Sequence, residues 1–186
     1  MTSRMLLLGL ICLPFVAAAE GFDYTYLEGG YVSTELDLGP IDVDGDGLGV
    51  RGAYAFADEW YAFAGLADQE FDFDVDGTQL QFGVGWHNSL SDTVDMLAEA
   101  SYVSVDLDSA FASADEDGFG LGVGVRAHAW ENVELEAGIA YVDLDDSDTS
   151  VNLDGRYYLT EMVAVGLGLS FSDDATGWTL GFRAEF

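Results

Sequence analysis

Hydrophobic and polar residues alternate with a period of two along most of this chain. In residues 80–86 (LQFGVGW), every second residue is large and apolar, and glutamine or glycine lies between. The same alternation recurs in residues 119–126, 133–141, 151–159 and 163–171. Because successive side chains of a strand point to opposite faces, each segment predicts a β-strand with one apolar face. No comparable helical period is present.

Ten such strands are predicted, and the alternation is least regular in the first, third and fifth. Their expected ranges are 23–36, 46–57, 60–73, 78–89, 94–107, 117–130, 133–144, 149–160, 162–172 and 176–186. Brief turns follow the even-numbered strands, whereas longer acidic segments, expected as loops, follow the odd-numbered ones. This arrangement is typical of bacterial outer-membrane barrels, whose longer loops face outside. The predicted fold is all-β, a transmembrane up-and-down antiparallel β-barrel of ten strands, with eight strands as the alternative.

Aromatic residues lie where an outer-membrane barrel requires them. Trp60, Trp86 and Trp130 fall beside the short turns, where a periplasmic girdle belongs, and Trp178 falls at the opposite end. The C-terminal segment WTLGFRAEF alternates up to a terminal aromatic residue and resembles the signal read by the barrel assembly machinery, a predicted partner. The residues predicted to carry this signal are Trp178, Leu180, Phe182 and Phe186.

The first 19 residues have the pattern of a cleavable signal peptide. Arg4 precedes a short apolar run, and three alanines at 17–19 supply the small residues that signal peptidase recognises. The expected organisation is a signal peptide at 1–19 and one outer-membrane β-barrel domain at 20–186, located in the cell outer membrane. The single cysteine, Cys12, lies in the signal peptide, so the exported chain uses no disulfides.

The composition is strongly acidic, with 35 aspartates and glutamates against 5 arginines and no lysine. Loss of Arg4 with the signal peptide leaves 35 acids against 4 arginines, a net charge of −31. Such a surface repels nucleic acid, which excludes that class of partner. The expected partners are instead outer-membrane lipid and lipopolysaccharide, and the chain is expected to be a monomer.

A secreted, soluble β-barrel that binds a ligand is the main alternative fold, since closure removes its edge strands as well. Such a barrel buries its apolar face around a core. Here the other face is crowded with glycine and alanine, while the apolar face is uniformly large. This contrast favours a narrow interior with lipid outside.

If the large apolar residues face lipid, alternation turns most charged strand residues toward the lumen. An arginine that faces lipid at the bilayer centre costs about 2–4 kcal/mol, so this free-energy cost also favours the position that faces the lumen. Within a narrow lumen, guanidinium groups pair with carboxylates. The predicted lumen ion-pair network consists of Glu28, Arg51, Glu99, Arg126, Glu134, Glu136, Asp154, Arg156, Arg183 and Glu185.

Ten strands enclose a lumen only somewhat wider than that of eight-stranded barrels, which side chains fill. The favoured interpretation is a non-enzymatic barrel with a structural or cell-surface interaction role, held shut by its ion pairs. The alternative is a narrow channel or uptake component. Such a channel would favour cations, because acids outnumber bases inside.

One fragment has the residue types of a hydrolase. His87-Asn88-Ser89 resembles the His-x-Ser of lipid A deacylases, with Glu99 as a conceivable third member. The predicted chain direction places this fragment at the periplasmic end, far from lipid A in the outer leaflet. Ten-stranded surface proteases raise their strands well above the membrane, whereas the predicted strands of about 11–14 residues barely exceed its span. The chain is therefore predicted not to be an enzyme.

Two acidic segments, at 42–47 and 72–77, spell the D-x-D-x-D-G start of a calcium-binding EF-hand loop. Position twelve of each is Ala53 or Gly83 instead of the required glutamate, so neither is an EF-hand. One interpretation is that these aspartates keep the loops hydrated. The other is that they bind Ca²⁺ or Mg²⁺ loosely, together with lipopolysaccharide phosphates, and no other cofactor is expected. The candidate ligands are Asp42, Asp44, Asp46, Asp72, Asp74 and Asp76.

The start of the expected mature chain resembles a known family. Residues 24–31 (YTYLEGGY), the acidic DGDG at 44–47 and the strand opening LGVRG at 48–52 are similar to the Ax21 family of small Gram-negative outer-membrane proteins. The likeness covers the whole mature chain in its length and in the spacing of its alternating segments. The specific part of the likeness is this first hairpin. The resemblance implies a role in cell-surface behaviour such as biofilm formation or motility, and it implies no catalytic residues.

Overall fold

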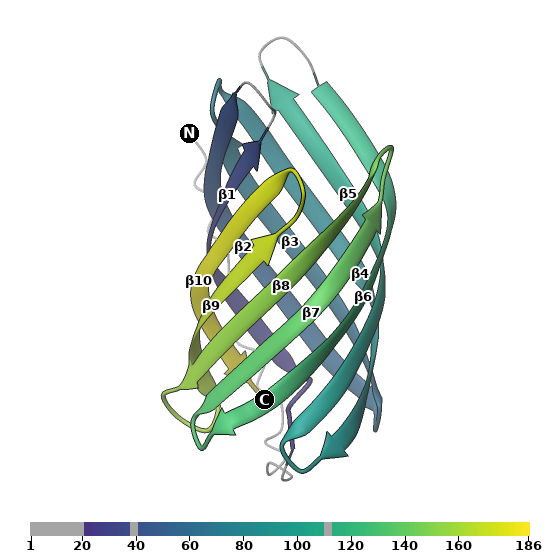
Figure 1. Ribbon diagram of the computed structural model, residues 1–186, viewed down its shortest axis with the longest axis vertical. Helices are drawn as coiled ribbons and strands as arrows, with labels where there is room; N and C mark the ends of the chain where they lie inside the picture. Colours follow the sequence, from purple (N-terminus) through teal and green to yellow (C-terminus); the bar gives the residue numbers. More distant parts are fainter. Residues whose placement is uncertain (1–20, 38–40, 110–112) are drawn as a thin grey trace, which may run out of the picture.

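Backbone pairing joins the alternating segments into one closed antiparallel barrel (Figure 1). The computed structural model describes residues 21–37, 41–109 and 113–186, so the predicted signal peptide lies outside the described residues. Each strand pairs with its neighbours in sequence, and the first strand pairs with the last. The strands are β1 (Tyr26–Asp37), β2 (Asp42–Ala57), β3 (Trp60–Phe71), β4 (Val75–Ser91), β5 (Val94–Ser109), β6 (Ser113–Trp130), β7 (Val133–Asp143), β8 (Ser147–Tyr158), β9 (Val163–Phe171) and β10 (Ala175–Glu185).

The apolar face predicted from the alternation is the exterior of the barrel. In β6, the side chains of Leu121, Val123 and Val125 are all exposed on the outside, whereas Arg126, the next residue, is buried inside. The prediction of a ten-stranded up-and-down barrel is confirmed, and the eight-stranded alternative is excluded. In the described part of the chain, no helix is long and apolar enough to cross a bilayer.

The strand ends differ from the prediction at the acidic end of the barrel. β2 begins at Asp42 instead of 46, and β6 begins at Ser113 instead of 117. Asp42 lies directly opposite Asp37 in the β1–β2 pairing. A strand ends where backbone pairing ends, not where the composition becomes acidic, because outward aspartates stay hydrated while the ladder continues. Much of the acidic sequence predicted as loop is therefore strand.

The longer strands remove one argument used against an enzyme. β4, β5 and β6 contain 17, 16 and 18 residues, and they form the tallest side of the barrel (Figure 1). A membrane-spanning strand needs only about 9–11 residues, so these strands continue well beyond the apolar band. The expectation of strands of about 11–14 residues is therefore wrong for β2, β4, β5 and β6, whereas none of the other six strands exceeds 12 residues.

The connection between β3 and β4 is a tight turn rather than a loop. Phe73 and Asp74 have φ angles of 68° and 57°. These left-handed residues reverse the chain within the three residues 72–74 that separate the paired Phe71 and Val75, although glycine and asparagine adopt such angles at lower cost than phenylalanine. The phenyl ring of Phe73 is 75% exposed at the tip of this hairpin.

The two ends of the barrel carry the predicted aromatic residues on the outside. Trp60 lies opposite Trp86 in the β3–β4 register, at the end where the short turns and the C-terminus lie (Figure 1). At the other end, the indole of Trp178 packs against the ring of Tyr31, with centroids 5.4 Å apart. Trp130, the last residue of β6, is also exposed near the short turns. These positions fit two aromatic girdles.

Candidate functional site in the barrel lumen

Strand register brings the charged lumen residues to neighbouring positions. Glu28 lies opposite both Arg51 and Arg183, and Glu134 lies opposite Arg156. Every member of the predicted network takes part in at least one ion pair. The ten residues are Glu28, Arg51, Glu99, Arg126, Glu134, Glu136, Asp154, Arg156, Arg183 and Glu185.

Glu134 is the centre of this network. Its Oε1 accepts hydrogen bonds from Arg126 Nε at 2.8 Å and from Arg156 Nη1 at 2.7 Å. Its Oε2 accepts one from the Tyr158 hydroxyl at 3.1 Å, and Arg183 Nη1 lies 3.8 Å from Oε1. Glu134 and Arg126 are each only 1% exposed. Buried charges of this kind are tolerated only when they are paired, so the carboxylate and the guanidiniums depend on one another.

Two further pairs extend the network toward β1 and β2. Arg183 donates from Nε and Nη2 to Glu28 Oε2, at 2.8 and 2.6 Å, and its guanidinium carbon lies 3.8 Å from the ring centroid of Tyr26. Arg51 pairs with Glu99, which also accepts a hydrogen bond from the Tyr61 hydroxyl at 2.8 Å. Guanidiniums are therefore held by carboxylates on one side and aromatic faces on the other.

The residues before β1 fold into the barrel at the end where the short turns lie. The ring of Phe22 stacks on His128 with centroids 4.2 Å apart, and the ring of Tyr24 stacks on His87 at 3.8 Å. The Tyr24 hydroxyl donates to Asp95 Oδ2 at 2.8 Å. Burial raises the pKa of the Tyr24 hydroxyl, so it stays a neutral donor.

Backbone and ionic contacts hold this N-terminal segment in place. Arg126 Nη1 donates to the backbone oxygen of Asp23 at 3.2 Å, and the Asp23 carboxylate accepts from the Thr25 amide at 2.7 Å. Burial raises the pKa of the Asp23 carboxyl, partly offset by the Thr25 hydrogen bond and by Arg126. The segment from Phe22 to Thr25, together with the network below the cavity, is called the lumen plug.

Sequence reasoning missed the aromatic half of the plug. Tyr24, Tyr26, Tyr61, Phe63 and Leu97 form a buried cluster inside the barrel. The lumen face was predicted to be crowded with glycine and alanine, which is wrong at this end. The available signal was the irregular alternation of the first, third and fifth strands, where large side chains occupy both faces.

A lumen glycine makes room for one of these rings. A Cβ atom added at Gly85 would lie 2.1 Å from the Tyr61 ring, so only glycine permits the ring to lie against β4 at this point. Small residues of the lumen face are thus needed where a large ring crosses from a neighbouring strand.

The candidate hydrolase residues are not assembled as a triad. Glu99 is engaged by Arg51 and Tyr61, and the His87 ring lies beneath Tyr24 in the plug. His87 Nδ1 lies 3.5 Å from Asp95 Oδ2 instead. No hydrogen bond joins His87 to Ser89 among the described residues.

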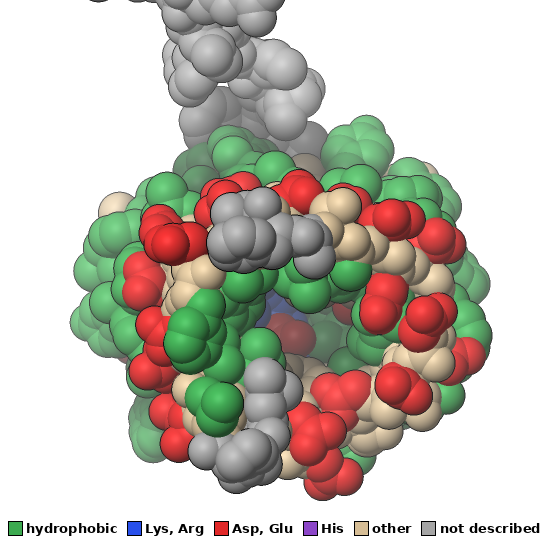
Figure 2. Space-filling view, turned by 90° about the horizontal axis from the view of Figure 1, so that it is seen from above, with side chains coloured by type: hydrophobic (Ala, Val, Ile, Leu, Met, Phe, Trp, Pro, Cys, Tyr) green, Lys and Arg blue, Asp and Glu red, His purple; other side chains and the backbone are tan. Residues whose placement is uncertain are grey.

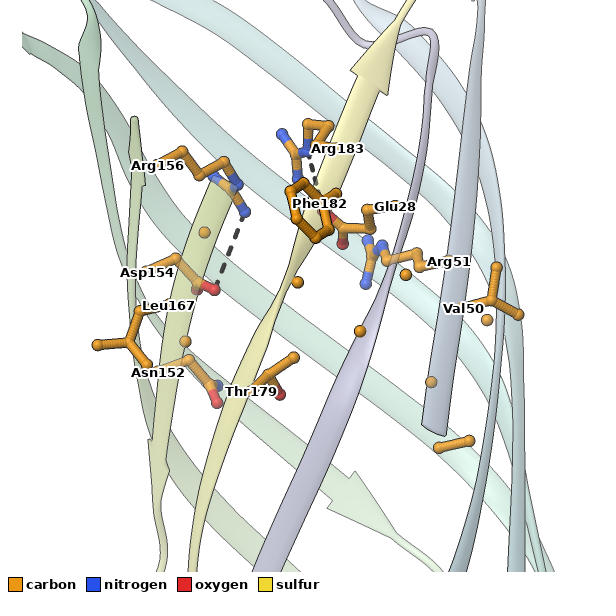
Figure 3. Close-up of a pocket in the computed structure, with 18 of the residues that line it drawn as sticks. Glu28, Val50, Arg51, Asn152, Asp154, Arg156, Leu167, Thr179, Phe182 and Arg183 are labelled. Carbon is orange, nitrogen blue, oxygen red and sulfur yellow. Dashed lines mark hydrogen bonds and ion pairs between the residues drawn. The ribbon is translucent and has the colours of Figure 1, made fainter. Parts of the chain in front are cut away.

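Above the network, the lumen widens into a cavity of about 440 Å³, here called the outer cup. Figure 2, a view from the acidic end, shows this hollow ringed by acidic side chains, with charged groups at its base. Its walls come from β1–β4 and β8–β10. Figure 3 shows Asn152, Asp154 and Thr179 on one wall and Arg51 with Glu28 on the other. The lumen is therefore filled at one end and open at the other.

A row of acidic residues crosses four neighbouring strands on the outside of the barrel. Asp46 lies opposite Glu70, Glu70 opposite Asp76, and Asp76 opposite Asp108, and all four are exposed. This row is called the acidic belt. Like charges directly opposite one another destabilise a sheet, so the belt favours bound counter-ions.

The six aspartates proposed as metal ligands gather near this belt. Asp42, Asp44 and Asp46 lie on β2 and Asp76 lies on β4, whereas Asp72 and Asp74 form the turn. The backbone amide of Asp72 donates to the Asp44 carbonyl at 2.9 Å, so the two runs are neighbours. Among the described residues, no three acidic or histidine side chains are arranged to hold a metal ion alone.

Residues 4–171 match the family described as outer membrane protein beta-barrel domain. The chain belongs to this family. As an outer membrane β-barrel protein it is located in the outer membrane, and its exposed apolar exterior faces lipid. The soluble, secreted alternative was therefore wrong. In members of this architecture the longer hairpins extend outward from the cell. The long strands β4, β5 and β6 extend toward the acidic end, which assigns the outer cup to the cell surface and the plug to the periplasmic side.

Solved structures of other proteins are similar to this outer membrane β-barrel protein. The translocator domain of the autotransporter NalP from Neisseria meningitidis matches with a TM-score of 0.51 and 10% identity, over 87% of this chain and 88% of that one. Ail, the attachment invasion locus protein of Yersinia pestis, matches with a TM-score of 0.46 and 16% identity, over 87% and 97%. The KdgM porin matches with a TM-score of 0.48 and 10% identity, over 87% and 99%. No curated protein sequence matches the chain.

Proposed function

We propose that this protein is a closed, non-enzymatic barrel that acts at the cell surface and does not conduct ions. The observation that carries the proposal is the lumen plug, in which Arg126, Glu134 and Tyr61 are almost completely buried. An ion crossing this section would have to displace paired charges and packed rings. The resemblance of residues 24–31 and 44–52 to the Ax21 family supports a role in biofilm formation or motility.

Planar-bilayer recording tests the closed lumen. The wild-type protein is expected to give no stable single-channel steps, because the plug leaves no continuous aqueous path. The double variant Tyr24→Gly, Arg126→Ala removes a ring and a guanidinium from the plug, and it is expected to produce steps that favour cations. Stable steps in the wild type would contradict the proposal.

A narrow cation-selective channel is the second candidate. The open outer cup and the excess of carboxylates over arginines in the network favour it. This function requires the plug to move, and the N-terminal segment is its most separable part because it precedes the first strand. The wild-type recording described above decides between the two candidates.

We also propose that the acidic belt binds Ca²⁺ or Mg²⁺ together with lipopolysaccharide phosphates. Ca²⁺ takes six to eight oxygen ligands, and the aligned carboxylates supply only part of such a set. Phosphate oxygens of neighbouring lipopolysaccharide would complete the coordination. The binding is expected to be loose, because the described residues form no preassembled metal cage.

Thermal unfolding in lipopolysaccharide-containing vesicles tests this cation binding. Millimolar calcium is expected to raise the melting temperature by roughly 2–4 °C relative to EDTA, which corresponds to about 1 kcal/mol of stabilisation. The variant Glu70→Gln, Asp76→Asn removes the centre of the belt and is expected to lose most of this difference. A melting temperature that is the same in calcium and in EDTA would argue against bound cations.

The last strand has the features of an assembly signal. Trp178, Leu180, Phe182 and Phe186 are all exposed on the lipid-facing side at the C-terminal end. β10 also closes the barrel by pairing with β1. These features support recognition of this strand by the assembly machinery before closure, and the complete closure of the sheet supports a monomer.

A further inference from the structure

The outer cup has the size and form of a ligand site. Its volume of about 440 Å³ falls in the range of about 300–1,000 Å³ that is typical of small-molecule pockets. It opens toward the cell exterior, as the hollow in Figure 2 shows. The plug closes the other end, so a molecule that enters the cup meets a floor. The closed-barrel function proposed above leaves this space without a role.

The charged groups at the base of the cup are sorted by accessibility. Three of the four guanidiniums are almost fully covered, with side-chain exposures of 2–8%. Four carboxylates remain between a quarter and about a third exposed, and they are Glu28, Glu99, Glu136 and Asp154. Of these four carboxylates, Glu28 and Asp154 line the cup, together with Arg51, which is 27% exposed, and the covered Arg156 and Arg183. A molecule in the cup therefore meets two accessible carboxylates and one accessible guanidinium.

Asp154 is the carboxylate with the most free hydrogen-bonding capacity. Its closest ionic partner is Arg156 Nη2, at 3.9 Å, and it accepts no hydrogen bond from another described residue. Its side chain lies on the cup wall with Asn152 and Thr179 (Figure 3). Glycine on the adjacent strand keeps this space open, since a Cβ atom added at Gly168 would lie 2.8 Å from Asp154 Oδ1.

The opposite wall supplies further acceptors. Glu28 Oε2 is engaged by Arg183, whereas its Oε1 accepts no hydrogen bond from another described residue. Gln79 and Gln81 line the same side of the cup with neutral amide groups. Free carboxylate oxygens on two walls, with Asn152 beside Asp154 and the two glutamines on the side of Glu28, suit a ligand that carries donors at both ends.

We propose that the outer cup binds a small organic cation of the polyamine class. One ammonium group would donate to Asp154 and a second to Glu28, while the amide oxygens of Asn152 and Gln79 accept the remaining N–H groups. The acidic rim steers cations toward the cup and repels anions. A bare metal ion fits less well, because the described residues present no group of three convergent ligands. The inference rests on the proposed closed lumen only in that the plug provides the floor.

Calorimetric titration of the folded protein with spermidine tests the proposal. One saturable site is expected, and Asp154→Asn is expected to weaken binding about 10-fold or more, because a hydrogen bond to a charged group is lost. Asp92→Asn removes the same charge from the exposed β4–β5 turn, at the opposite end of the barrel from the acidic belt, and is expected to change affinity less than about twofold, since a distant, exposed and screened charge contributes little. Absence of saturable binding, or equal losses in the two variants, would overturn the proposal.

A second variant guards against loss of folding. Thr179→Arg places a guanidinium beside Asp154 in open space, and it is expected to abolish spermidine binding while the heat-modifiable gel shift of a folded barrel persists. Undiminished binding in this folded variant would also overturn the proposal, as would displacement of spermidine by an equal concentration of Mg²⁺. Bilayer conductance in the wild type would contradict the closed lumen alone, so the two failures are distinguishable.

Discussion

Replacing Glu134 by glutamine is expected to destabilise the barrel by about 3–5 kcal/mol, the usual result of removing one partner from a buried ion pair. The Glu134 carboxylate accepts from both Arg126 and Arg156 through a single oxygen. Its neutral replacement leaves Arg126 with only Glu136 at 3.7 Å, and Arg156 with the more exposed Glu136 and Asp154. Urea unfolding in lipid vesicles, followed by tryptophan fluorescence, measures the loss.

Glu136→Gln is the matched control for this prediction. Glu136 is two residues from Glu134 on β7, so it also faces the lumen, but its side chain is 28% exposed. Water can compensate a partly exposed group, so this variant is expected to cost about 1 kcal/mol or less. Similar losses in the two variants would show that Glu134 is not the centre of the network.

Replacing Val123 by arginine is expected to cost about 2–4 kcal/mol, because the guanidinium would face the middle of the lipid layer. Val123 lies near the centre of β6 and is 61% exposed on the exterior. The same unfolding experiment in vesicles measures the effect. Because this cost arises only where the side chain faces lipid, the measurement also tests which face of the sheet meets the membrane.

Asp117→Arg provides the control on the same strand and the same face. Asp117 is six residues from Val123, so the even spacing keeps both side chains outside. It lies in the acidic part of β6, beyond the apolar residues, and the substitution there is expected to cost about 1 kcal/mol or less. A penalty at 117 as large as that at 123 would contradict the depth assigned to the apolar band.

The ion-pair network could be derived from the sequence because two simple rules agree on it. Alternation assigns each residue to a face, and the cost of exposing arginine to lipid selects the inward face. Arg126, Arg156 and Arg183 obey both rules. What the alternation could not assign was the partner of each guanidinium, because that depends on the relative register of neighbouring strands.

The acidic segments were wrongly predicted as loops for a related reason. The run at 42–47 has the composition of a loop, yet its residues continue the ladder with β1 and β3. An acidic composition indicates only that the side chains are hydrated. Side chains on the outer face of a strand that extends above the membrane are hydrated as well. Only the pairing partner decides whether the backbone is a strand.

The sequence by itself determined that this protein is a membrane barrel, since alternation, signal-like N-terminus and aromatic ends depend only on local order along the chain. It also determined which charged residues face inward. The tertiary structure alone decided that the lumen is filled at one end and hollow at the other. Rings from β1, β3 and the segment before β1 meet charges from β5, β6 and β10, which are distant in sequence. Such convergence follows from closure and register, and neither is written in the local pattern.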